Sequence, residues 1–246
     1  MAKFSAGIPD RPRARRRFGA CAALLLLLTA AHASDSVRSA DPARTAGASW
    51  PGGYAARVAA LAVLETLNAE LLSHDSATLT LEHWCALHRL ATPALIAAAR
   101  VPGVDKPASP EQRRELRVAP AEPLGYRRVR LRCGALVLSE ADNWYVPARL
   151  TPEMNRLLDT TDEPFGKVVR ELHFQRHTLS SRLLWQPLPE GWEMNADAGS
   201  GAAADLDLPA ALLEHRALLY LPDGTPFSDL VETYTSNVLA FPPPRL

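Results

Sequence analysis

Apolar and polar positions alternate most clearly between residues 126 and 147, a stretch typical of two strands. Its first strand carries the run Arg128, Val129, Arg130, Leu131, Arg132 and Cys133. Because side chains alternate between the two faces of a strand, the apolar residues share one face and the arginines share the other. Adjacent guanidinium groups repel one another, so we expect the arginine face to meet acidic side chains, water or an anionic ligand.

A second pair of strands is predicted near the C-terminus, over residues 215–235. Asp223 and Gly224 give a strong tight-turn signal there, between two apolar runs. Residues 173–185 are typical of a strand or an irregular arm with aromatic anchors.

Helical spacing of apolar residues predicts a helix over residues 54–72, where leucines recur at Leu61, Leu64, Leu67 and Leu71. Further helices are expected from Ser109 onward and over residues 78–90, 93–100, 151–158 and 164–172. Ser109 and Gln112 flank a proline in the pattern of a capping box. Helices segregated from antiparallel strand pairs make the fold class α+β, a central antiparallel sheet with helices packed on it.

Composition divides the chain into consecutive parts. Residues 1–33 have a basic start, a short apolar run and a small-residue cleavage site, which are typical of a cleavable signal peptide. Residues 34–53 are rich in Ser, Ala, Asp and Gly and predict a flexible leader. Residues 54–246 are then expected to form a single domain, with residues 186–209 as a long surface loop. This organisation predicts a periplasmic or secreted protein with no stable membrane insertion after signal cleavage.

The charge of the mature chain limits its partners. Residues 1–33 hold six basic residues and one acidic residue of the 27 and 27 in the whole chain, so the remainder carries a net charge of about −5. Broad electrostatic binding to nucleic acid is disfavoured, and an anion site must be built from specific arginines. We expect a monomer.

Two cysteines, Cys85 and Cys133, remain after the signal peptide. Export would permit a disulfide, but the alternation places Cys133 on the apolar face of its strand. We therefore expect two buried thiols, with a disulfide as the alternative.

Candidate chemistry is sparse. His173 and His177 have a spacing of four residues, but no third ligand is nearby in the sequence, so we expect no metal site. Glu232 shares a strand face with Leu230 and Tyr234, so its carboxylate must either face solvent at an edge or be paired inside. The predicted helix start at residues 164–167 has free backbone N–H groups, which suit either an ordinary cap or a carboxylate.

Taken together, these residues resemble the chorismate lyase (chorismate–pyruvate lyase) family. The resemblance covers roughly residues 60–240 and rests on short motifs whose order and spacing match. They are Asp75-Ser76-Ala77-Thr78, Arg128, Cys133, Pro164-Phe165-Gly166 and Glu232. Two positions depart from the family pattern, because Phe165 stands where the family has leucine and Ala77 where it has methionine.

The resemblance implies a chorismate lyase-like fold and an exported protein that eliminates pyruvate from chorismate, or from a related enolpyruvyl or aromatic carboxylate, to give a hydroxybenzoate such as 4-hydroxybenzoate. Such a reaction implies no cofactor and no metal. The alternative is a non-catalytic periplasmic binding protein for a small aromatic carboxylate.

Site roles follow from the same resemblance. Arg128 would bind the ring carboxylate, and Glu232 would hydrogen-bond the ring hydroxyl. The backbone N–H groups of Ala77 and Phe165 would complete the shell of the carboxylate. Either Arg130 or Arg176 would hold the pyruvyl carboxylate.

Overall fold

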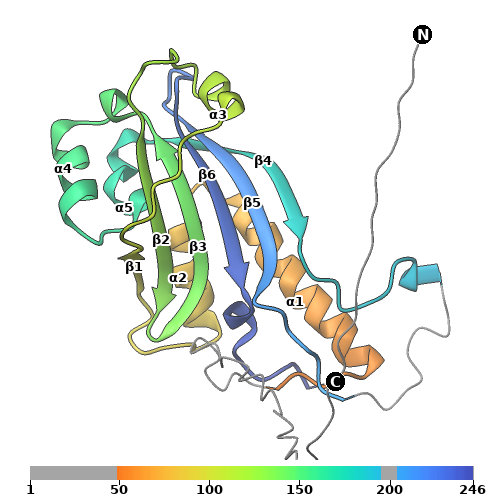
Figure 1. Cartoon of the computed structure of the whole chain (residues 1–246). Helices are drawn as coiled ribbons and strands as arrows, with labels where there is room; N and C mark the ends of the chain where they lie inside the picture. The colour runs from red at the N-terminus through yellow and green to blue at the C-terminus, as the bar shows by residue number, and fades with distance from the viewer. Residues whose placement is uncertain (1–48, 195–203, 246) are drawn as a thin grey trace, which may run out of the picture. The chain divides into compact units, whose positions relative to one another are not determined.

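The computed structural model describes residues 49–194 and 204–245 (Figure 1). The expected signal peptide and residues 34–48 of the expected leader lie outside this part of the chain. The described residues contain a six-stranded sheet in which every pair of neighbours is antiparallel, and helices pack on it. The α+β class expected from the sequence is confirmed.

The strands follow the order β1-β2-β3-β6-β5-β4 across the sheet. Their bounds are β1 (Ile96–Arg100), β2 (Gly125–Cys133), β3 (Leu136–Tyr145), β4 (Gln175–Leu183), β5 (Ala211–Tyr220) and β6 (Pro226–Thr235). Both hairpins predicted from alternation, β2–β3 and β5–β6, are present at adjoining places in the sheet. Gly224 takes a φ of 81° in the turn between β5 and β6, a conformation in which glycine is favoured.

The helices are α1 (Tyr54–Ser73), α2 (Ala77–Leu87), α3 (Pro110–Glu115), α4 (Pro152–Thr160) and α5 (Phe165–Val168). Figure 1 shows α1 and α2 behind the sheet and α3 in front of it. We call the face covered by α1 and α2 the inner face. It carries the main core, in which Leu64, Leu67 and Leu71 of α1 are fully buried. The expected capping box is present: the Ser109 hydroxyl accepts from the backbone N–H of Gln112, and the Gln112 side chain accepts from the backbone N–H of Ser109.

None of the helices in the described part of the chain has the length and apolar content that a membrane-spanning helix needs.

Two predicted helices differ from the structure. Residues 93–100 contain β1 instead, an edge strand that pairs with β2 from Ile96 opposite Cys133 to Arg100 opposite Val129. Alanine favours a helix, but the open hydrogen-bonding edge of β2 and burial of Ile96 and Ala98 favour the strand. Residues 164–172 form only the short helix α5, followed by a 3-10 turn at Arg170–Leu172.

The end of the expected leader belongs to the packed domain. Trp50 is only 1% exposed, and its indole Nε1 donates to the carbonyl of Leu239 at 2.9 Å. Its ring also packs edge-on against Phe241. The prediction that residues 34–53 are flexible is therefore wrong for residues 49–53, because a large aromatic side chain there fills the core.

The long segment over residues 186–209 also contacts the domain. In its described part Leu188 is buried, and the backbone N–H of Leu206 donates to the carbonyl of Trp50 at 2.7 Å. This part is therefore more than a surface loop.

Cys85 and Cys133 form a disulfide, with their Cα atoms 6.2 Å apart. The bond joins α2 to the end of β2. The expectation of two thiols is wrong, since packing of α2 on the inner face brings Cys85 against the apolar face of β2, where Cys133 lies.

Candidate functional site

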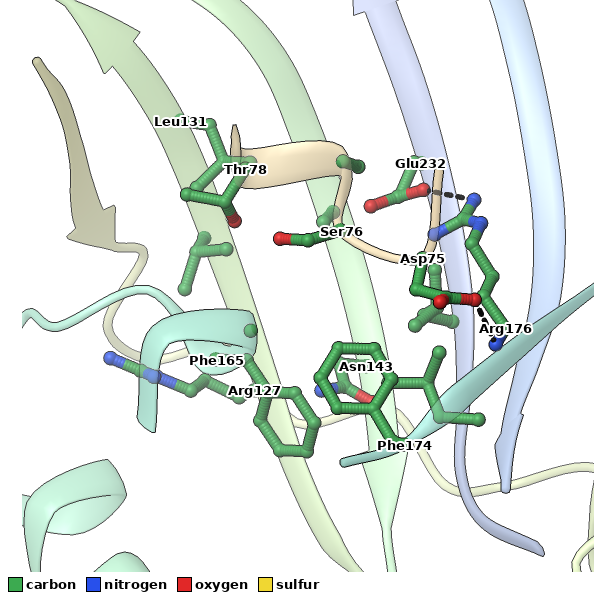
Figure 2. Close-up of a pocket in the computed structure, with 16 residues that line it drawn as sticks. Asp75, Ser76, Thr78, Arg127, Leu131, Asn143, Phe165, Phe174, Arg176 and Glu232 are labelled. Carbon is green, nitrogen blue, oxygen red and sulfur yellow. Dashed lines mark hydrogen bonds and ion pairs between the residues drawn. The ribbon is translucent and has the colours of Figure 1, made fainter. Parts of the chain in front are cut away.

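A pocket lies between the inner face of the sheet and a cover made by the start of α2, by α5 and by the start of β4 (Figure 2). It holds about 560 Å³ of space, counted out to its open mouth. The walls are mainly apolar and are formed by Val129, Leu131, Ala141, Phe165, Phe174, Leu219 and Leu230.

The register of the sheet fixes the floor of the pocket. One row of directly opposed residues runs from Arg127 through Asn143 to Leu230. The next row runs from Val129 through Ala141 to Glu232. Directly opposed residues of an antiparallel pair point to the same face, so both rows face the pocket.

A buried ion pair stands at one side of the pocket. The Arg176 guanidinium lies 2.6 Å from Glu232 Oε2, with side chains 4% and 8% exposed. Tyr234 also donates its hydroxyl to this oxygen, at 3.1 Å. Burial by itself lowers the pKa of Arg176, but the Glu232 carboxylate raises it above the ordinary value. Burial and the same carboxylate raise the pKa of Tyr234 well above its ordinary value. Arg176 therefore stays charged beside Glu232, and Tyr234 stays a hydrogen-bond donor.

The floor carries a second buried cation. Arg127 is 3% exposed, and its guanidinium donates to the carbonyls of Glu163 at 2.8 Å and Thr161 at 2.9 Å. Its Nε is buried without a partner, and it makes no ion pair with any carboxylate of the described residues. Burial lowers the pKa of Arg127, and the charge of Arg100 lowers it further. An arginine nevertheless remains charged. The carboxylates of Asp162 and Asp159 partly offset this charge from a distance, so Arg127 is a buried cation without a directly contacting carboxylate among the described residues.

The cover of the pocket brings polar groups and aromatic rings over the floor. Ser76 caps α2 and Thr78 lies in its first turn, where backbone N–H groups have no intrahelical partner. Gly166 of α5 approaches this turn so closely that a Cβ atom there would lie 3.3 Å from the Ser76 hydroxyl. Figure 2 shows the rings of Phe165 and Phe174 together on the cover.

The residues predicted from the sequence are only partly brought together. Ala77, Phe165, Arg176 and Glu232 line the pocket. Arg128 and Arg130 do not: both lie on the outer face of the sheet and bind the Glu140 carboxylate, at 3.0 and 2.8 Å. Arg128 and Glu232 therefore do not face each other across a hollow. An acidic side chain, one of the partners expected for that face, thus pairs with two of its three arginines, while Arg132 donates to the carbonyl of Ala135 at 3.4 Å.

Arg127 and Asn143 are polar pocket residues that the sequence reasoning missed, whereas Asp75 belongs to a motif quoted above but was given no role. A signal for Arg127 was available, since it lies two positions before Val129 in the strand and therefore shares its face. Asp75 receives a hydrogen bond from the backbone N–H of Arg176 at 2.9 Å, a contact between distant segments that no local pattern reveals.

In residues 49–194 and 204–245 no cluster of His, Cys, Asp or Glu side chains is suited to a metal ion.

Comparison with known proteins gives one strong similarity and several distant ones. The uncharacterized protein y4mC of Sinorhizobium fredii is 60% identical over 198 residues, which are 80% of this chain and 84% of y4mC. Among solved structures, PhnF from Mycobacterium smegmatis is 13% identical with a TM-score of 0.42, over 70% of this chain and 69% of PhnF. The PhnF effector domain is 13% identical with a TM-score of 0.41, over 66% of this chain and 90% of that domain. These two structures are too distant to indicate function. No protein-family model matches the chain.

Proposed function

Because the chain belongs to the same protein family as y4mC of Sinorhizobium fredii and encloses an apolar pocket with a buried cation on its floor, we propose that it binds a small aromatic carboxylate there. The observation that carries this proposal is Arg127, which is 3% exposed and has no carboxylate partner among the described residues. Burying a charge is costly unless an opposite charge compensates it. A ligand carboxylate over Arg127 would supply that charge.

The rest of the pocket suits a planar ring. Val129, Leu131 and Ala141 offer a flat apolar floor, and Phe165 and Phe174 close over it. Aromatic side chains favour stacked or edge-on contacts with another ring. At the far side Glu232 has a second carboxylate oxygen, Oε1, for which the described residues provide no hydrogen bond, so it can accept one from a ligand hydroxyl.

Binding of 4-hydroxybenzoate, measured by isothermal titration calorimetry with the oxidised domain, tests this function. Saturable 1:1 binding supports it. Absence of heat and of thermal stabilisation with 4-hydroxybenzoate, benzoate and 4-hydroxybenzamide would refute it.

Catalysis is the second candidate, and the paired Arg176 and Glu232 favour it. The resemblance to chorismate lyase suggests that the pocket releases pyruvate from chorismate and leaves 4-hydroxybenzoate. In this chain Arg176 rather than Arg130 would hold the pyruvyl carboxylate, because Arg130 lies outside the pocket. Incubation with chorismate, followed by enzymatic detection of pyruvate, separates an enzyme from a binding protein. Binding of 4-hydroxybenzoate without pyruvate release would identify a binding protein.

We also propose that the protein is exported to the periplasm or secreted. The disulfide between Cys85 and Cys133 supports this location, since disulfides persist mainly in oxidising compartments. Mass spectrometry of the protein from a cell-envelope fraction would detect loss of residues 1–33. Intact protein confined to the cytoplasm would rule export out.

A further inference from the structure

Asn143 occupies the middle of the pocket floor and has no role in the function proposed above. It lies in β3, is 5% exposed, and stands directly between Arg127 of β2 and Leu230 of β6. Figure 2 shows it beneath the two phenylalanine rings of the cover. A buried amide at such a position needs hydrogen-bond partners for both of its ends.

Among residues 49–194 and 204–245, only one end of the amide has a hydrogen-bond partner. Ser228, which is fully buried in β6, donates its hydroxyl to Asn143 Oδ1 at 2.6 Å. This bond holds the oxygen toward β6 and leaves Nδ2 on the opposite side of the amide. In the part of the chain that the structure describes, Nδ2 has no acceptor.

Two donors on directly opposed residues therefore lack an acceptor among the described residues. Asn143 Nδ2 is one, and Arg127 Nε, on the neighbouring residue of the same row, is the other. Guanidinium groups have donors only, so Arg127 cannot satisfy the amide. A group that accepts several hydrogen bonds and carries negative charge would satisfy both, and a carboxylate does so.

We propose that Asn143 is a specificity-determining residue that donates to the ligand carboxylate beside Arg127 and fixes the direction in which the ligand lies. The inference rests on the proposed function and narrows it to one class of ligand. The carboxylate lies over the row of Arg127 and Asn143, and the opposite end of the ring points to Glu232.

The register of the sheet relates Asn143 to Glu232. Glu232 is directly opposite Ala141, which is two positions from Asn143, so Asn143 and Glu232 are diagonal neighbours on one face. Diagonal neighbours have Cα atoms roughly 7–8 Å apart. The proposed ligand is a single-ring aromatic carboxylate with a hydroxyl or amino group at the end of the ring that faces Glu232 Oε1.

Two substitutions and three probes test the proposal by titration calorimetry. Asn143→Leu removes the donor and keeps a side chain branched at Cγ, and Asn143→Asp replaces the donor with a negative charge while keeping an acceptor for Ser228. The probes are 4-hydroxybenzoate, benzoate and the neutral amide 4-hydroxybenzamide. Ser139→Ala is the matched control, because Ser139 is a buried β3 residue that lies opposite Leu131, outside the pocket lining.

We expect Asn143→Leu to lower the affinity for 4-hydroxybenzoate about tenfold, the loss typical of one hydrogen bond to a charged group. Asn143→Asp should weaken the two carboxylates more than Asn143→Leu does, and should weaken the neutral amide least. Ser139→Ala should bind like the wild type. Thermal melts identify any variant that does not fold, and the other variant then decides.

If the wild type binds 4-hydroxybenzoate and both Asn143 variants bind it equally well, the inference is wrong while the proposed function stands. Equal weakening of the binding of all three probes by Asn143→Asp also contradicts the inference, because a negative charge beside the ligand carboxylate should repel the two carboxylates more than the neutral amide. If the wild type binds none of the probes, both proposals fail.

Discussion

Arg127 and Arg128 are adjacent in β2, yet their guanidinium groups lie on opposite faces of the sheet. Arg127 is buried on the floor of the pocket, and Arg128 pairs with Glu140 on the outer face at 3.0 Å. Two residues of the same type thus offer one buried cation without an acidic partner and one compensated surface cation. This difference makes Arg128 a natural control for Arg127.

Replacing Arg127 with alanine should weaken 4-hydroxybenzoate by about 2–4 kcal/mol, since the ligand carboxylate would be left desolvated without its cation. Arg128→Ala should leave the affinity unchanged. Titration calorimetry with both variants measures the difference. Because Arg127 also holds the carbonyls of Thr161 and Glu163, circular dichroism must first show that the variant is folded. Equal effects of the two substitutions would contradict the assignment.

Replacing Glu232 with alanine should destabilise the domain by about 3–5 kcal/mol, because the buried Arg176 loses the carboxylate that compensates its charge. Glu214→Ala is the control, since Glu214 also pairs with an arginine of β4, but at a site where the Arg182 side chain is 66% exposed. That loss should be less than about 1 kcal/mol. Urea unfolding measures both. Similar losses of unfolding free energy in the two variants would show that the buried ion pair contributes no more to stability than the exposed one.

Reduction of the disulfide should destabilise the domain. Cys85 and Cys133 are separated by 48 positions, for which loop-closure entropy predicts about 4 kcal/mol. Chemical unfolding of a protein that begins at Ser34, with and without reductant, measures the effect. A thiol assay on the denatured, unreduced protein should find no free cysteine. Two titratable thiols would restore the expectation made from the sequence.

His215 should make stability depend on pH in the acidic range. It is fully buried between α1 and the sheet, where it bonds to Asn68 at 2.8 Å, and burial lowers its pKa from 6.5 to about 4. Below about pH 6.5 His215 binds a proton in the unfolded chain but not in the folded domain. The free energy of unfolding therefore falls as the pH is lowered, until about pH 4. The total loss is roughly 3 kcal/mol.

His215→Gln cannot titrate, and comparison with it removes the contribution of the acidic residues. The difference in unfolding free energy between wild type and variant should shrink, or move in favour of the variant, as pH falls from about 7 to 4. Parallel pH profiles would show that His215 does not titrate in this window.

Local patterns in the sequence predicted most of the fold. The leucine spacing gave α1, Ser109 and Gln112 gave the start of α3, and alternation with a turn at Gly224 gave the β5–β6 hairpin. The prediction of a helix over residues 93–100 was wrong because pairing with the free edge of β2 decides their conformation, and local propensity gives no information about that pairing. The disulfide was undecided for the same reason, since Cys85 reaches Cys133 only after α2 packs on the sheet.

The site was predicted less well than the fold. The strand pattern left two alternatives open for Glu232, a solvent-exposed edge or a paired interior position, and the structure has the interior one, where Glu232 pairs with Arg176. The run of alternating arginines drew attention to Arg128. Because side chains alternate along a strand, however, Arg127 and not Arg128 shares the inner face with Val129. The partnership of Arg176 with Glu232 joins strands that are not neighbours in the sheet, and the sequence could not decide between Arg176 and Arg130.

The indole of Trp50 joins the two ends of the described chain, because it bonds to Leu239 and packs on Phe241. Proteolytic trimming therefore has a natural limit. A peptidase that stops before Ser49 leaves the contacts of Trp50 with Leu239 and Phe241 intact. A peptidase that cuts beyond Trp50 removes this side chain, and the C-terminal segment then loses its anchor. Expression of a shortened protein for crystallisation should accordingly start no later than Ser49.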